Sequence, residues 1–127
     1  MNRLGDNVIV ESINFKVMEM MEMFRAGKET MEINEAVKEM KNDPNARLID
    51  VRTPEEYQTG HIPGSALLPL DHAQNIVQLV PDKKTKIYVY CRSGVRSAKA
   101  ADLFQRLGYE NVVDIGGITK WKGSLER

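Results

Sequence analysis

Residues 86–108 carry the sequence KIYVYCRSGVRSAKAADLFQRLG, which predicts a strand, a short polar loop and a helix in direct succession. The apolar run Ile87–Tyr90 indicates a buried strand. Cys91, the only cysteine of the chain, stands where this run stops. Arg92–Ser97 form the expected loop and Ala98–Leu107 the expected helix, which Gly108 would end. Such a unit is typical of sheets in which strands alternate with helices.

The sequence around this unit repeats the alternation. Further strands are predicted at Met31–Ile33, Arg47–Val51 and Asn111–Ile115, and further helices at Asn34–Lys41, Pro54–Gly60 and Asp71–Leu79. Asn34 is the expected N-cap of its helix, and Thr53 is expected to cap the helix that Pro54 begins. Strands separated by helices pair mostly in parallel, so we expect a three-layer α/β fold with a central sheet flanked by helices.

Composition limits the classes of function that the 127 residues can have. Eighteen basic and eighteen acidic residues cancel, so net charge gives no reason to expect nucleic acid or a membrane surface as a partner. One cysteine forms no internal disulfide, and no Cys/His cluster has the spacing of a metal site. No stretch approaches the roughly 20 apolar residues that span a bilayer. Gly5, Asp6 and Glu11 interrupt any apolar signal core, so we expect a cytoplasmic protein.

The chain is expected to divide into an N-terminal extension, residues 1–30, and one domain, residues 31–127. From Asn14 to Ala26 the apolar residues recur at helical spacing, and four of the seven methionines lie there. We predict an amphipathic, Met-rich helix that packs on the protein's own domain. The alternative is a surface for a partner or a second copy, because flexible methionine surfaces adapt to varied partners. The oligomeric state stays open.

The residues after Cys91 are of the kind that activates a thiol. They are Arg92, Ser93, Gly94, Val95, Arg96 and Ser97. Cations and a helix N-terminus favour the thiolate, which is the nucleophilic form of cysteine. Successive backbone N–H groups in such a loop also form an anion-binding nest. An inert buried cysteine is the alternative, but two arginines and two serines are not core neighbours. We therefore predict a reactive Cys91 beside an anion site.

Polar residues also follow the strand upstream. Asp50 could accept hydrogen bonds from loop amides at its strand end, and Arg52 could pair with Glu55 or Glu56. His61 is a candidate acid or base only if it faces the cysteine, and is otherwise polar surface. Because ion pairs near a helix start are routine, we expect Asp50, Arg52 and His61 to support the site rather than to act in it.

Three stretches of the chain carry a resemblance to a known family. Residues 50–65 read DVRTPEEYQTGHIPGS, residues 91–96 read CRSGVR, and residues 116–121 read GGITKW. In this order they are similar to the upstream, active-site and C-terminal motifs of single-domain rhodaneses, which are sulfurtransferases. The resemblance extends from about Ile33 to Gly123, implies a rhodanese-like fold, and leaves residues 1–30 outside.

The resemblance implies a covalent reaction that fits the local chemistry. Cys91 would attack the outer sulfur of thiosulfate or of a similar small anionic donor, release sulfite and keep the sulfur as a persulfide. Cyanide, a protein thiol or a small thiol would then accept it. Backbone N–H groups of Arg92–Arg96 would hold the persulfide, and the two guanidiniums would bind the donor. Ser93 and Ser97 would add hydroxyl donors. No metal or organic cofactor is implied.

Two other classes of function stay open. Related phosphatases use Cys-x5-Arg and carry a histidine before the cysteine, whereas Cys91 to Arg96 is Cys-x4-Arg and Tyr90 precedes it. The shorter loop disfavours a cysteine phosphatase or an arsenate reductase. Rhodanese-like domains also serve as non-catalytic binding or regulatory modules, typically after loss of the cysteine. The presence of Cys91 disfavours that function as well.

Overall fold

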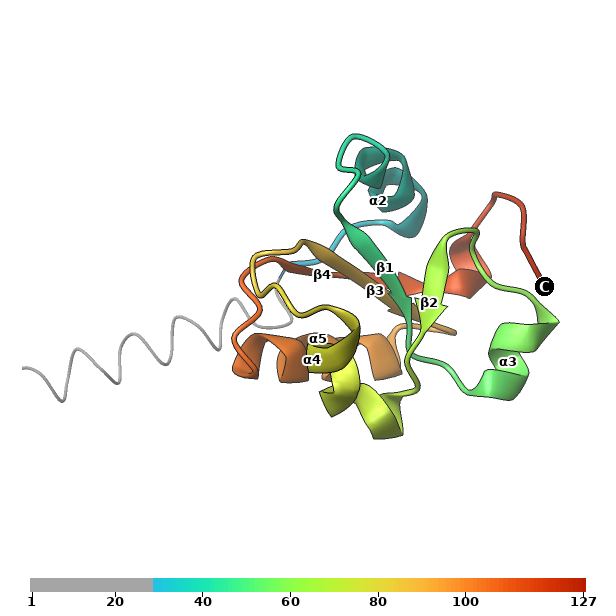
Figure 1. The fold of residues 1–127 in the computed structure, drawn as a ribbon. Coiled ribbons are helices and arrows are strands. Elements are labelled where there is room, and N and C mark those ends of the chain that lie inside the picture. The colour runs from blue at the N-terminus through green and yellow to red at the C-terminus, as the bar shows by residue number, and fades with distance from the viewer. Residues whose placement is uncertain (1–28) are drawn as a thin grey trace, which may run out of the picture.

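The centre of the fold is a parallel sheet in which the strands follow the order β2-β1-β3-β4 (Figure 1). Its strands are β1 (Arg47–Asp50), β2 (Ser65–Leu67), β3 (Ile87–Cys91) and β4 (Val112–Gly117). The computed structural model describes residues 29–127, so the helix predicted at residues 14–26 lies outside the described part. The predicted α/β fold with a parallel central sheet is confirmed.

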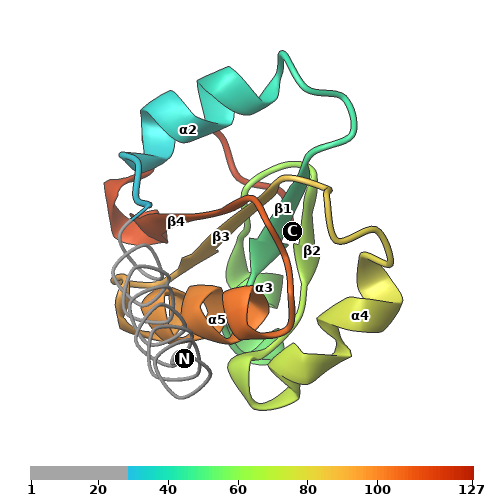
Figure 2. The same ribbon diagram turned by 90° about the vertical axis from the view of Figure 1, so that its left-hand side faces the viewer.

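Helices cover both faces of the sheet (Figures 1 and 2). The helical elements are α2 (Ile33–Met40), α3 (Pro54–Thr59), η1 (Leu70–Asn75), α4 (Ile76–Leu79), α5 (Val95–Arg106) and η2 (Ile118–Lys120). The views place α2 on one face, and α4 and α5 on the other. Within residues 29–127, no helix combines the length and the apolar character that a bilayer crossing needs.

Two apolar clusters join the layers because successive strand residues point to opposite faces. Ile49 and Val89 pack with Phe104 on the α5 face. Tyr88 packs with Ile33 on the α2 face. Every residue of β3 is buried, as expected of a central strand covered by helices on both sides. Burial of each large apolar side chain stabilises the fold by roughly 1.5–3 kcal/mol. Apolar packing alone therefore fixes the position of β3.

The start of α2 differs from the prediction. The predicted strand Met31–Ile33 is wrong, because Glu32 is the N-cap and Ile33 is already helical. The Glu32 carboxylate accepts the N–H of Asn34 at 3.1 Å, so Asn34, the predicted cap, lies inside the first turn. The Glu32 carboxylate accepts two N–H groups of the first turn, and it therefore caps the helix in place of the shorter Asn34 amide. The strand-like contact lies just before, where Thr30 bridges to Asp114.

The start of α5 also differs from the prediction, and here the difference affects the site. The helix begins at Val95 rather than at Ala98. Gly94 precedes it with a φ of 108°, a left-handed conformation that favours glycine. The chain therefore turns from β3 into α5 at once, and Arg96 and Ser97 lie in the first helical turn instead of in a loop.

The end of β4 packs against the turn between β3 and α5. The β3–β4 register shifts after Val89, so that Cys91 lies opposite Gly117. A Cβ atom at Gly117 would lie 2.2 Å from the carbonyl oxygen of Arg92 and 2.6 Å from the Cα of Ser93. The φ of Gly117 is −116°, which any residue can adopt. Close approach of two backbones, and not an unusual conformation, therefore requires glycine here.

We expect Gly117→Ala to lower the free energy of unfolding by roughly 1–3 kcal/mol, because the new methyl group must displace the backbone of Arg92 and Ser93. Urea unfolding followed by circular dichroism measures the loss, and the rate of Cys91 alkylation reports whether the turn has moved. Gly64→Ala is the control, because its Cβ would meet nothing within 4 Å. It should cost backbone strain and leave alkylation unchanged. A Gly117→Ala variant with unchanged stability and alkylation would contradict the close packing.

Candidate active site

Cys91 ends β3 at the carboxyl edge of the sheet, where parallel α/β folds bind their ligands. The residue is 1% exposed. The Sγ atom accepts the backbone N–H of Gly94 at 3.0 Å and lies 3.5 Å from Oγ of Ser97. The turn into α5 therefore surrounds the sulfur with a backbone donor on one side and a hydroxyl on the other.

Ser97 connects the thiol with the neighbouring backbone. It is fully buried, and its Oγ donates to the carbonyl of Gly94 at 3.1 Å and lies 3.5 Å from the carbonyl of Gly116. A hydroxyl can rotate between acceptors. The same group can thus donate to the sulfur of Cys91 when that sulfur carries a negative charge.

The N-terminus of α5 adds further donors beside the sulfur. Gly94 occupies the N-cap position and has no side chain that could cap the first turn. The free N–H groups and the positive end of the dipole of this 12-residue helix therefore face the cysteine turn. Helix N-termini with free N–H groups are sites where proteins bind anions, so this geometry suits an anion next to Cys91.

The two arginines of the cysteine turn have different surroundings. The Arg92 side chain is exposed, while its carbonyl accepts the N–H of Thr119 at 3.3 Å. Arg96 is partly buried, and its Nη1 and Nη2 donate to the two carboxylate oxygens of Glu56 at 2.7 and 3.0 Å. Arg92 is thus open to solvent, whereas the guanidinium of Arg96 is held by a carboxylate.

Glu56 also belongs to the first turn of α3. Its carboxylate accepts the N–H of Thr53 at 3.0 Å, and Oγ1 of Thr53 accepts the N–H of Glu56 at 3.2 Å, which is a capping box. The hydrogen bond from Arg96, together with those from Thr53, holds the pKa of Glu56 at about 2, below its ordinary value of 4.5. Sequence reasoning missed the contact with Arg96 because 40 residues separate the partners.

A buried ion pair follows β1. Arg52 Nη2 lies 2.7 Å from Oδ2 of Asp50, and Nε lies 3.0 Å from each carboxylate oxygen. Oδ1 of Asp50 also accepts the backbone N–H of Arg52 at 2.9 Å. The predicted pairing of Arg52 with Glu55 or Glu56 is wrong, because the buried carboxylate of Asp50 engages the guanidinium. Arg52 Nη2 also donates to the carbonyl of Gly60 at 2.8 Å, which ties the end of α3 to β1.

The contacts of His61 lie within the α3–β2 connection. Its Nδ1 lies 2.9 Å from the carbonyl of Tyr57, and the two rings stack with centroids 3.6 Å apart. Its Nε2 lies 3.9 Å from Glu126, and the backbones of His61 and Glu126 form an antiparallel bridge. These partners give His61 a packing role in the connection that Arg52 also holds.

Tyr90 stands where the related phosphatases carry histidine. It is fully buried, and its hydroxyl accepts the N–H of Ile62 at 3.1 Å and donates to Oγ of Ser65 at 3.1 Å. Burial, and to a lesser degree the charge of Asp50, raises the pKa of Tyr90. The neutral phenol thus braces the start of β2 from the central strand.

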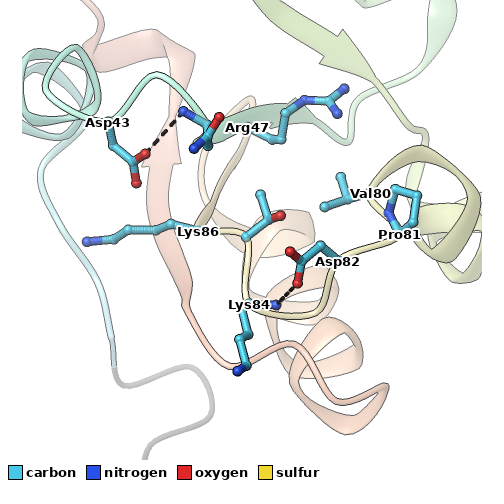
Figure 3. Close-up of a pocket in the computed structure, with 9 residues that line it drawn as sticks. Asp43, Arg47, Val80, Pro81, Asp82, Lys84 and Lys86 are labelled. Atoms are coloured by element: carbon cyan, nitrogen blue, oxygen red, sulfur yellow. Dashed lines mark hydrogen bonds between the residues drawn. The ribbon is translucent and has the colours of Figure 1, made fainter.

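The described surface has a hollow at each edge of the sheet. One, of about 540 Å³, is at the amino ends of β1 and β3, remote from Cys91, and the two hydrogen bonds drawn in Figure 3 are turn contacts of Asp43 and Asp82. None of the predicted site residues lines it. The other, of about 190 Å³, adjoins the cysteine turn at Ser93 and is bordered by Gly116 and Gly117. The predicted cysteine turn therefore lies beside the smaller hollow and away from the larger one.

The fold and the cysteine turn identify the family. The chain belongs to the rhodanese-like domain family, which matches residues 34–124. It is 39% identical over 71 residues to the thiosulfate sulfurtransferase PspE of Escherichia coli, a match that covers 55% of this chain and 68% of the relative. The structure of the human single-domain sulfurtransferase TSTD1 is similar to this one, with a TM-score of 0.64 and 25% sequence identity. The match covers 72% of this chain and 93% of TSTD1.

A larger relative contains a similar segment. The chain is 41% identical over 80 residues to the adenylyltransferase and sulfurtransferase uba4 of Ogataea parapolymorpha. The match covers 62% of this chain and 21% of that enzyme, so the chain spans about a fifth of its length. Sulfur transfer is thus the activity that recurs in the names of these relatives.

We expect Arg52→Ala to lower the free energy of unfolding by roughly 3–5 kcal/mol, because it leaves the buried carboxylate of Asp50 without a counter-charge. Chemical denaturation measures the loss. Arg106→Ala is the control, because it breaks an exposed ion pair with Asp102 at 3.0 Å and should cost at most about 1 kcal/mol. Equal losses in the two variants would contradict a stabilising role for the buried pair.

The lowered pKa of Glu56 predicts a pH dependence of stability. Because its pKa is about 2 in the folded state and 4.5 ordinarily, the contribution of Glu56 is fully present above pH 4.5 and is lost as pH falls toward 2. Glu56→Gln should be less stable than the wild type at neutral pH, and the difference should shrink over this window. Unfolding free energies at several pH values measure it, with Glu55→Gln as control. A difference independent of pH would contradict the pairing.

Proposed function

We propose that this protein moves sulfane sulfur from a small anionic donor to a thiophilic acceptor through a persulfide on Cys91. The observation that carries the proposal is the position of the Cys91 sulfur, 3.0 Å from the N–H of Gly94 and beside the uncapped N-terminus of α5. A negatively charged sulfur is stabilised there both as the attacking thiolate and as the outer atom of a persulfide.

The first half-reaction conserves atoms and charge. The thiolate of Cys91 attacks the outer sulfur of thiosulfate, a new S–S bond forms, and the bond between that sulfur and the sulfonate breaks. Sulfite leaves with the electron pair of the broken bond, and the enzyme keeps an anionic persulfide. In the second half-reaction a thiol or cyanide attacks the outer sulfur, and Cys91 returns to the thiolate.

The residues of the turn divide the work. Gly94 and the free N–H groups at the start of α5 stabilise the persulfide, and Ser97 adds its hydroxyl. Exposed Arg92 meets the incoming anion, and Arg96 presents its guanidinium, held by Glu56, from the first helical turn. Ser93 and Val95 complete the turn. Asp50, Arg52 and His61 brace the surrounding connections and take no part in the chemistry.

The relatives named thiosulfate sulfurtransferase support thiosulfate as a donor. A protein thiol or a small thiol is the proposed acceptor. The division into an extension, residues 1–30, and a domain, residues 31–127, and the cytoplasmic location stay predictions.

The Cys91→Ser variant tests the proposal. Incubation of the reduced wild type with thiosulfate should add the mass of one sulfur atom, and cyanide should remove it. Cys91→Ser should fold normally and gain nothing, because a serine hydroxyl forms no persulfide. Intact-protein mass spectrometry and release of sulfite give the two readouts. Turnover retained in Cys91→Ser would overturn the mechanism. No mass gain in the wild type, with a thiol that still alkylates, would favour a phosphatase or a binding module.

A further inference from the structure

We propose that Glu56 is a specificity-determining residue of the cysteine site, because it neutralises Arg96 and so disfavours doubly charged sulfur donors relative to singly charged ones. This inference rests on the proposed sulfur transfer and names the class of donor that suits the site. Singly charged donors include organic thiosulfonates, RSO2S⁻, and persulfide anions. Thiosulfate is the doubly charged case.

Arg96 lies close enough to the sulfur for its charge to matter. It occupies the first turn of α5, one residue before Ser97, whose Oγ is 3.5 Å from the sulfur of Cys91. Hydrogen bonds to Glu56 are the main cause of the raised pKa of Arg96, and the charges of Cys91 and Asp50 add smaller contributions. Arg96 therefore lies within electrostatic range of Cys91.

Glu56 holds this cation in a two-pronged contact. Both carboxylate oxygens of Glu56 accept hydrogen bonds, at 2.7 and 3.0 Å from Nη1 and Nη2 of Arg96. The side chain of Glu56 is 27% exposed and that of Arg96 is 31% exposed. A fork of this kind occupies one of the two edges through which a guanidinium binds a sulfonate with two hydrogen bonds, and it neutralises the charge at both. An incoming anion therefore meets a paired arginine rather than a free one.

The carboxylate is fixed in this position from its own helix. Glu56 accepts the N–H of Thr53 at 3.0 Å, and Oγ1 of Thr53 donates to the same oxygen at 3.2 Å. Because the pKa of Glu56 is about 2, the group stays charged at neutral pH. The pairing is thus a constant property of the site and does not switch with physiological changes in pH.

Pairing leaves the site with little positive charge for a dianion. Asp50 is paired with Arg52 and Glu56 with Arg96, while Arg92 takes part in none of the ion pairs found among residues 29–127. The Coulomb energy of a donor in this field is proportional to its charge. A change of one unit at Glu56 therefore acts twice as strongly on thiosulfate as on a thiosulfonate.

Glu56→Gln is the variant that isolates this effect. Glutamine at the same helical position keeps an oxygen for the capping box with Thr53, removes the charge and leaves Arg96 one acceptor in place of two. The probes are thiosulfate and methanethiosulfonate, which give up their outer sulfur to the same thiolate and release sulfite and methanesulfinate. We expect kcat/KM to rise about tenfold for thiosulfate and about threefold for methanethiosulfonate at low salt, with both gains smaller at high ionic strength.

Two further variants complete the design. Glu55→Gln removes the same charge from an exposed neighbour on α3 and should leave the ratio of the two kcat/KM values unchanged. Arg96→Gln removes the cation, leaves the Glu56 charge in place and should shift the ratio toward methanethiosulfonate. Circular dichroism and thermal unfolding verify that each variant folds. If Glu56→Gln does not fold, Arg96→Gln still tests the proposal.

The outcomes separate this inference from the proposed function. A ratio that rises about threefold in Glu56→Gln, but not in Glu55→Gln, supports the role of Glu56. An unchanged ratio, or an equal fall in kcat/KM for both donors, overturns it and leaves Glu56 as a structural residue, while wild-type turnover still supports sulfur transfer. A wild type that accepts sulfur from neither donor overturns the proposed function itself.

Discussion

The turn at Gly94 is the constraint on which the rest of the site depends. Its left-handed backbone, with a φ of 108°, lets the chain pass from the end of β3 into α5 within a few residues. The same conformation points the N–H of Gly94 at the sulfur of Cys91, 3.0 Å away. Because glycine offers no capping side chain, the first N–H groups of α5 stay free for an anion. One backbone conformation therefore sets the position of the Cys91 sulfur, its nearest donor and the proposed anion site together.

Around this turn, contacts from distant parts of the chain act as supports. The backbone at Gly117 lies so close to Arg92 that no side chain fits between them. From the other side, the capping box of α3 fixes Glu56, which holds Arg96. The ion pair of Asp50 and Arg52 anchors the connection after α3 through the carbonyl of Gly60. The site is thus stabilised by packing and polar contacts outside the cysteine turn, and its geometry does not depend on the loop alone.

Sequence patterns predicted the parts of the fold that local signals encode. The apolar run before Cys91, the cap at Thr53 and the helix end at Gly60 depend on neighbouring residues, and the structure contains all three. The short strand β2 was not predicted, because it is an edge strand of three residues held by pairing with β1. The start of α5 at Val95 was missed because it depends on the left-handed conformation of Gly94, which the local sequence pattern does not specify.

The polar partners of the site were the least predictable feature. The sequence offers several acids to each arginine, and which acid is chosen depends on where the helices place them. Arg52 turns back to Asp50, two residues away, while Arg96 reaches Glu56, 40 residues away. Residue types therefore indicated the chemistry of the site, but the charge that a substrate meets followed only from the three-dimensional arrangement.

The burial of Cys91 limits the shape of the donors and acceptors that can reach its sulfur. With 1% of the residue exposed, the reduced thiol admits only a slender donor whose terminal sulfur protrudes from its parent. In the proposed persulfide the reactive atom moves outward by one S–S bond, about 2 Å, so a bulkier acceptor can reach it. The same burial keeps large oxidants away from the reduced thiol. The burial of Cys91 therefore restricts the size of the sulfur donor more strongly than the size of the acceptor.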